Sequence, residues 1–146
     1  MPKFSQKKFM PYSCDEFYEL VADIKLYSEF LPWCISSRVN KTEKNQVNAS
    51  LLVGFQLIRE KFECSVSLDK SNNIIHAEHI DGPFKYLVNH WEFKPAEGGC
   101  VVNFFVEFEF KSPILNKIMG SLFEEAVKKM VSSFEERARN LYPKEN

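Results

Sequence analysis

One stretch near the C-terminal end of the chain, residues 112–142, constrains the fold more than any other because it predicts a long amphipathic helix. Ser112 is a favourable N-cap, Pro113 suits the first helical position, and Pro143 ends the pattern. A helix with one wide apolar face needs a broad, concave apolar surface to cover it. Apolar residues recur at i and i+4 through about seven or eight turns, at Ile114, Leu115, Ile118, Met119, Leu122, Phe123, Ala126, Val127, Met130, Val131, Phe134, Ala138 and Leu141.

The middle of the chain supplies that surface as strands, because from Ile35 onward apolar and polar residues alternate with a period of two. One buried and one solvated face are typical of an antiparallel sheet. A short polar link at 58–61 predicts a hairpin, and Phe105 breaks the alternation of the last strand. The clearest inward positions are Val47, Ala49, Leu51, Val53, Phe55, Leu57, Phe62, Cys64, Val66, Leu68, Leu87, Asn89, Trp91, Phe93, Val102, Phe104, Val106, Phe108 and Phe110.

The N-terminal part of the chain is expected to form one strand and two short helices. The strand covers residues 3–10, and Ser13 with Glu16 makes a capping box that opens the first helix. A second helix, at about 26–31, must end near Pro32, because the residue before a proline avoids helical geometry.

This order of elements predicts an α+β fold in one domain, residues 1–146. A strongly curved antiparallel sheet of about six or seven strands wraps around the long C-terminal helix and satisfies every apolar face. Two short helices and one long one need not fill such a sheet. We therefore expect an apolar space between the sheet and the long helix.

Composition excludes several classes of protein. The 19 basic and 20 acidic residues nearly cancel, so no overall charge gathers nucleic acid or an anionic membrane. The cluster of Lys3, Lys7 and Lys8 is interpreted as a solvated strand face. The four cysteines have no CxxC spacing, so we expect free thiols in a reducing compartment and no zinc site. The longest uncharged run, 45–58, is too short to span a bilayer.

The densest aromatic cluster, residues 27–34, reads YSEFLPWC and resembles the YxxFxPWC motif of the coenzyme Q-binding START-like proteins. The segments 53–55 (VGF) and 108–112 (FEFKS) are similar to that family as well. The resemblance covers essentially the whole chain and implies the helix-grip fold of START-type lipid-binding and polyketide cyclase-like domains. Bacterial members are often labelled RatA-type ribosome-association toxins, so the resemblance leaves two functions open.

The leading hypothesis is a non-catalytic carrier or chaperone that binds and delivers ubiquinone or a similar polyprenyl lipid and supports respiratory electron transport. No catalytic residue, cofactor or metal is expected; the quinone would be a bound ligand. Asn89 either donates to a quinone carbonyl or bonds neighbouring backbone, and plain core packing remains the alternative for each apolar position. The expected ligand-binding residues are Phe30, Leu31, Trp33, Val53, Phe55, Phe62, Asn89, Trp91, Phe104, Phe108, Met119, Phe123, Val127 and Met130.

The sequence leaves two alternatives open. An enzyme of the cyclase or dehydratase type, acting on an aromatic substrate, needs a titratable group inside the chamber, and only a register shift would turn His79 or His90 inward. A ribosome-associating toxin usually shows a basic stripe with exposed aromatic residues, which the sequence lacks outside the N-terminal lysines. We expect a cytoplasmic protein with a hydrophobic ligand as its partner and transient contact with the inner membrane as an option. The ribosome is the less favoured partner, and DNA is not expected.

Overall fold

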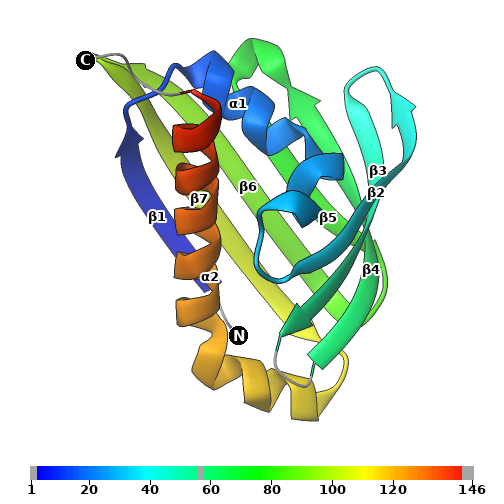
Figure 1. The fold of residues 1–146 in the computed structure, drawn as a ribbon. Coiled ribbons are helices and arrows are strands. Elements are labelled where there is room, and N and C mark those ends of the chain that lie inside the picture. The colour runs from blue at the N-terminus through cyan, green and yellow to red at the C-terminus, as the bar shows by residue number, and fades with distance from the viewer. Residues whose placement is uncertain (1–2, 56–57, 143–146) are drawn as a thin grey trace.

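The computed structural model describes residues 3–55 and 58–142, with Phe55 by its backbone alone. The described part of the chain contains one seven-stranded antiparallel sheet in the order β1-β7-β6-β5-β4-β3-β2. The sheet curves around α2, and α1 covers one end of the same concave face (Figure 1). The elements are β1 (Lys3–Met10), α1 (Cys14–Ala22), the 3-10 helix η1 (Ile24–Glu29), β2 (Cys34–Glu43), β3 (Gln46–Phe55), β4 (Ile58–Asp69), the 3-10 helix η2 (Lys70–Asn72), β5 (Ile74–Asp81), β6 (Phe84–Ala96), β7 (Gly99–Phe110) and α2 (Pro113–Leu141).

The helix starts follow the capping rules read from the sequence. The Ser13 hydroxyl accepts a hydrogen bond from the Glu16 backbone N–H, and the Glu16 carboxylate accepts one from the Ser13 N–H, both at 3.1 Å. The Ser112 hydroxyl accepts from the Leu115 N–H, so α2 begins where predicted. The second short helix, expected at about 26–31, is a 3-10 helix that starts at Ile24 and ends at Glu29.

The predicted apolar face of α2 is wrong in its first turns. Ile114 is 72% exposed and Ile118 is 38% exposed, and α2 bends within its first third (Figure 1). The Asn116 side chain causes this orientation: its Oδ1 accepts from the Phe110 N–H at 2.8 Å, and its Nδ2 donates to the Phe110 carbonyl at 2.9 Å. Because positions two residues away lie on the opposite side of a helix, Ile114 and Ile118 turn away from the sheet.

Two details of the sheet also differ from the sequence-based expectation. Ile58 already pairs with Phe55 and Arg59 with Gly54, so the link predicted at 58–61 is wrong and these residues belong to β4. Leu57, predicted to point inward, lies outside the described residues. Phe105 is a β7 residue paired with His90 of β6, on the face away from α2.

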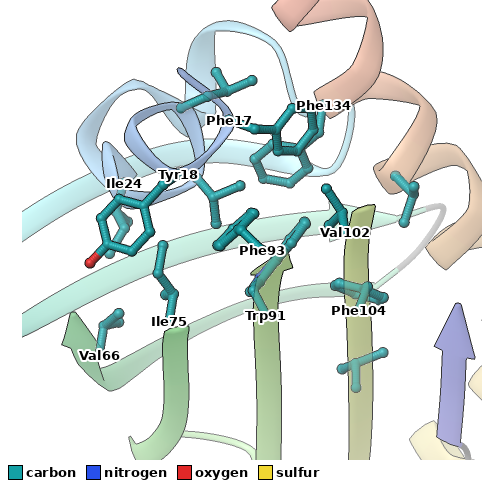
Figure 2. Close-up of a cluster of buried hydrophobic side chains, with 14 of the residues drawn as sticks. Phe17, Tyr18, Ile24, Val66, Ile75, Trp91, Phe93, Val102, Phe104 and Phe134 are labelled. Atoms are coloured by element: carbon teal, nitrogen blue, oxygen red, sulfur yellow. The ribbon is translucent and has the colours of Figure 1, made fainter. Parts of the chain in front are cut away.

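Aromatic rings fill the space beneath α1 and the second half of α2. Phe17 from α1 and Phe134 from α2 point toward Trp91 and Phe93 of β6 (Figure 2). The rings of Trp91 and Phe134 meet edge to face with centroids 5.1 Å apart, a favourable aromatic geometry. This packing anchors α2 over β6 and β7. Within the part of the chain that the structure describes, no helix is both long and apolar enough to cross a bilayer.

Candidate ligand-binding cavity

Beside that aromatic core, the concave face of the sheet retains a cavity of about 200 Å³. Alternate residues of β3 to β6 form its floor, because every second side chain of a strand points to the same face. The η1 helix, the segment after it and α2 close the cavity from above. The lining residues are Ile24, Tyr27, Leu31, Trp33, Cys34, Ala49, Leu51, Val53, Phe62, Cys64, Val66, Ile75, Ala77, Leu87, Asn89, Trp91, Val106, Met130 and Phe134.

The cavity brings together half of the residues that the sequence nominated for ligand binding. The seven at the wall are Leu31, Trp33, Val53, Phe62, Asn89, Trp91 and Met130. The side chain of Phe55 lies outside the described residues. The other six pack elsewhere in the described structure: Phe30, Phe104, Phe108, Met119, Phe123 and Val127.

Ring contacts show where the four phenylalanines among these six residues lie. Phe108 of β7 packs against Phe123 of α2 with ring centroids 5.1 Å apart, and Phe104 packs edge-on against Trp91 at 4.7 Å. These β7 positions therefore sit directly beneath the helix, where the core is filled. Phe30, at the end of η1, contacts Phe134 with centroids 5.2 Å apart.

Two small residues help to create the space, and sequence reasoning did not nominate them. Ala49 of β3 and Ala77 of β5 both line the cavity, and Ala77 is paired across the strands with Asn89. Large side chains surround them on the same face. The sequence did carry a signal for this space at Ala49. The alternation of β3 marks Ala49 as inward-facing, and its neighbours on that face, such as Val47 and Leu51, are larger.

Asn89 is the amide in the wall, and its orientation is fixed by two hydrogen bonds. The indole N–H of Trp91 can only donate, and it reaches Asn89 Oδ1 at 2.9 Å. Asn89 Nδ2 therefore faces the Phe105 carbonyl and donates to it at 2.9 Å, the backbone bond considered in the sequence analysis. Because an amide has two N–H groups and two lone pairs, one donor and one acceptor remain for a guest.

The titratable groups of the wall are all neutral near pH 7. Burial raises the pKa of the Cys64 thiol to about 12, and it also raises the pKa of the Cys34 thiol. Burial likewise raises the pKa of Tyr27, whose hydroxyl donates to the Val21 carbonyl. No Asp, Glu, His, Lys or Arg is among the described residues of the wall. The site therefore suits an uncharged, largely apolar guest.

Neither His79 nor His90 lines this cavity. A register shift between Glu63 and Cys64 does occur in the β4–β5 pairing, and the His79 ring packs edge-on against Phe84 at 5.3 Å. Burial, aided by Lys111, lowers the pKa of His79. His90 instead contacts His76.

Residues 29–33, which we call the clasp, hold the cavity closed against α2. Glu29 forms a 3.0 Å ion pair with Arg137, and the Trp33 indole N–H donates to the Ala126 carbonyl at 3.2 Å. The Lys129 ammonium lies 5.3 Å from the centre of the Trp33 ring. Because Leu31 and Trp33 also line the cavity, movement of the clasp would open it.

A curved antiparallel sheet that grips a long C-terminal helix over an apolar cavity defines the helix-grip, START-like class of proteins. A START superfamily protein from Mycobacterium smegmatis superimposes with a TM-score of 0.81 at 17% identity, covering 95% of this chain and 98% of that one. The chain belongs to the polyketide cyclase / dehydrase and lipid transport family, whose profile matches residues 10–135.

Two relatives with different names share about a third of the sequence. The ribosome association toxin RatA of Rickettsia prowazekii is 35% identical over 144 residues, covering 97% of this chain and 99% of the relative. The mitochondrial coenzyme Q-binding protein COQ10 homolog B of Xenopus laevis is 34% identical over 145 residues, covering 96% of this chain and 59% of the relative. These names associate the family with a lipid quinone in one case and with the ribosome in the other.

Proposed function

We propose that this protein binds ubiquinone or a similar polyprenyl quinone without transforming it, and delivers it as a carrier or chaperone. The observation that carries the proposal is the uncharged apolar cavity with one amide in its wall. A quinone offers a flat ring for Trp91 and Phe62, and its carbonyl oxygen would accept the remaining N–H of Asn89. The name of the Xenopus relative supports the same ligand class.

The size of the cavity limits which part of the ligand it encloses. Its volume of about 200 Å³ exceeds the roughly 150 Å³ of an engineered cavity that binds benzene. The cavity therefore has room for a substituted ring but not for a polyprenyl tail as well. The tail would leave past the clasp, where Leu31 and Trp33 would cover part of its apolar surface. Each Å² of that surface removed from water would stabilise the complex by roughly 25 cal/mol.

The wall argues against the enzyme alternative. A cyclase or dehydratase needs an acid or base poised to exchange a proton with its substrate. The titratable wall residues, Tyr27, Cys34 and Cys64, all have pKa values shifted upward and stay protonated near pH 7. A binding function asks for no such group.

Quinone titration with tryptophan fluorescence provides the test, because both tryptophans of the chain, Trp33 and Trp91, lie at the wall. A short-chain ubiquinone should quench their emission saturably, and organic extracts of the natively purified protein should contain a quinone by mass spectrometry. Ala77→Leu fills the cavity and should weaken binding by about tenfold, since overpacking costs on the order of 1–3 kcal/mol.

Ala96→Leu provides the matched control, because the same side chain is added at the end of β6, away from the cavity. It should leave binding unchanged, and circular dichroism should show both variants folded. Equal affinity of Ala77→Leu and Ala96→Leu for the quinone, or extracts free of quinone together with no saturable quenching, would reject the proposal.

Ribosome association is the second candidate function, and the name of the Rickettsia relative favours it. Of the N-terminal lysine cluster, Lys3 and Lys7 of β1 are the candidates for contact with RNA. Lys8 forms an ion pair with Glu135 at 3.0 Å. Co-sedimentation with ribosomal subunits at physiological salt tests this function. Loss of co-sedimentation in a Lys3→Gln/Lys7→Gln variant, with quinone binding retained, would assign the two activities to separate surfaces.

A further inference from the structure

Two histidines and two glutamates form a chain on the face of the sheet opposite the cavity. His76 of β5 and His90 of β6 are paired across the strands, and their Nδ1 atoms lie 2.8 Å apart. The Nε2 atom of His76 is 3.2 Å from Glu78 Oε1, and that of His90 is 3.2 Å from Glu92 Oε1. The proposed quinone function uses none of these four side chains.

The hydrogen bonds of these four side chains favour a cation between the two rings. Each carboxylate accepts an N–H from the Nε2 atom that faces it, which leaves a lone pair on each Nδ1 of a neutral imidazole. Two lone pairs that face each other at 2.8 Å repel. The contact becomes attractive once one positive ion lies between the nitrogens.

We propose that His76 and His90 form a binding site for a divalent transition-metal ion, held by their two Nδ1 atoms. Imidazole nitrogen is a preferred ligand of Ni²⁺, Cu²⁺ and Zn²⁺. The two Nδ1 atoms are 2.8 Å apart. If each lies about 2.0–2.1 Å from the ion, the N–metal–N angle is about 85–90°. That angle matches two neighbouring positions of the tetragonal geometry of Ni²⁺ and Cu²⁺.

Both rings must turn to bind the ion, because lone pairs that face each other along the Nδ1–Nδ1 line have to converge at about 85–90°. The ring centroids are 5.1 Å apart and the ring planes meet at 65°, so each Nδ1 points at its partner. Tilting both rings about their side-chain torsions directs the two lone pairs at one point. Within the described residues no three His, Cys, Asp or Glu side chains converge on a metal position, so water would complete the coordination.

The two glutamates have the role that carboxylates usually take behind metal-bound histidines. Each accepts the remaining ring N–H, which fixes the tautomer and makes the other nitrogen a better ligand. Across the outer face the pair is flanked by the uncharged residues Ser67 of β4 and Phe105 of β7.

The metal site would share its two strands with the cavity. Ala77 and Asn89, the residues next to His76 and His90, are paired with each other and line the cavity on the inner face. The ion would therefore join β5 to β6 directly behind the amide. The two sites lie on opposite faces of one sheet, so a metal and a quinone would not compete for space.

Nickel titration of the untagged full-length protein tests the proposal, because the chain has only three histidines. In NMR spectra of the imidazole protons, one equivalent of Ni²⁺ should broaden the signals of His76 and His90. The signal of His79, which packs against Phe84, should remain sharp. Isothermal titration calorimetry should show one ion bound for each chain.

Variants distinguish this site from adventitious binding. His76→Asn and His90→Asn should each abolish Ni²⁺ binding, and Glu92→Gln should weaken it by roughly 10- to 100-fold. Glu92→Gln also keeps the proposal testable if a histidine variant does not fold. The proposal is overturned if millimolar Ni²⁺ leaves all three signals sharp, if His79 broadens equally, or if His90→Asn binds as tightly as the unaltered chain.

Discussion

Replacing Phe134 by alanine should reduce the free energy of unfolding by about 4 kcal/mol. Phe134 is 2% exposed, and removing a fully buried phenylalanine costs about 3–5 kcal/mol. The upper part of that range applies because the ring meets Tyr27, Phe30 and Trp91 at centroid distances of 5.4, 5.2 and 5.1 Å. Each such aromatic pair contributes about 0.5–1.5 kcal/mol beyond its buried area.

Urea unfolding followed by circular dichroism measures this loss, and thermal unfolding should show the midpoint lowered by roughly 10–15 °C. Phe9→Ala is the matched control, because Phe9 is 48% exposed and its truncation should cost about 1 kcal/mol or less. The reasoning fails if Phe134→Ala destabilises the protein by no more than Phe9→Ala does. Because Phe134 lines the cavity, its removal enlarges the space for a guest, so a short-chain quinone should stabilise Phe134→Ala more than it stabilises Phe9→Ala.

Three further results are expected. Ser13→Ala removes the side-chain half of the capping box and should cost about 0.5–2 kcal/mol in urea unfolding, whereas Ser121→Ala, on the exposed face of α2, should be nearly neutral. Burial lowers the pKa of His79, so the folded state resists its protonation. The free energy of unfolding should therefore decline as the pH falls below about 6.5. His79→Gln should flatten that decline in unfolding curves measured between about pH 5 and 7.5. All four cysteines are buried, so a thiol reagent such as DTNB should label the folded protein slowly. In denaturant the same reagent should label four thiols rapidly. Fast labelling of the native state would contradict the packing.

The elements of this fold were predictable where local chemistry and tertiary packing agree. Ser112 and Pro113 mark the start of α2, and the alternation of inward and outward residues marks the strands. The link predicted at 58–61 failed because Arg59, Glu60 and Lys61 combine the composition of a turn with strand geometry. Charged residues on the solvated face of a strand look the same as turn residues in a short window.

The candidate site was only half visible in the sequence, for a geometric reason. Alternation states which face a residue occupies, but not where along a curved sheet the helix touches it. Phe104 and Phe108 face inward as predicted and lie where the core is filled, whereas Ala49 and Ala77 lie where space remains. The curvature that separates these two regions depends on the packing of all seven strands.

The position of β1 at the edge of the sheet beside β7 has a consequence for biosynthesis. Its residues pair with partners 90 to 104 positions further along the chain, from Met10 with Cys100 to Lys3 with Glu107. At about 5–20 residues per second, the emerging polypeptide carries β1 unpaired for several seconds before β7 is made. During that interval the apolar side chains of β1 lack their partners in β7, so the first strand made is among the last to be paired.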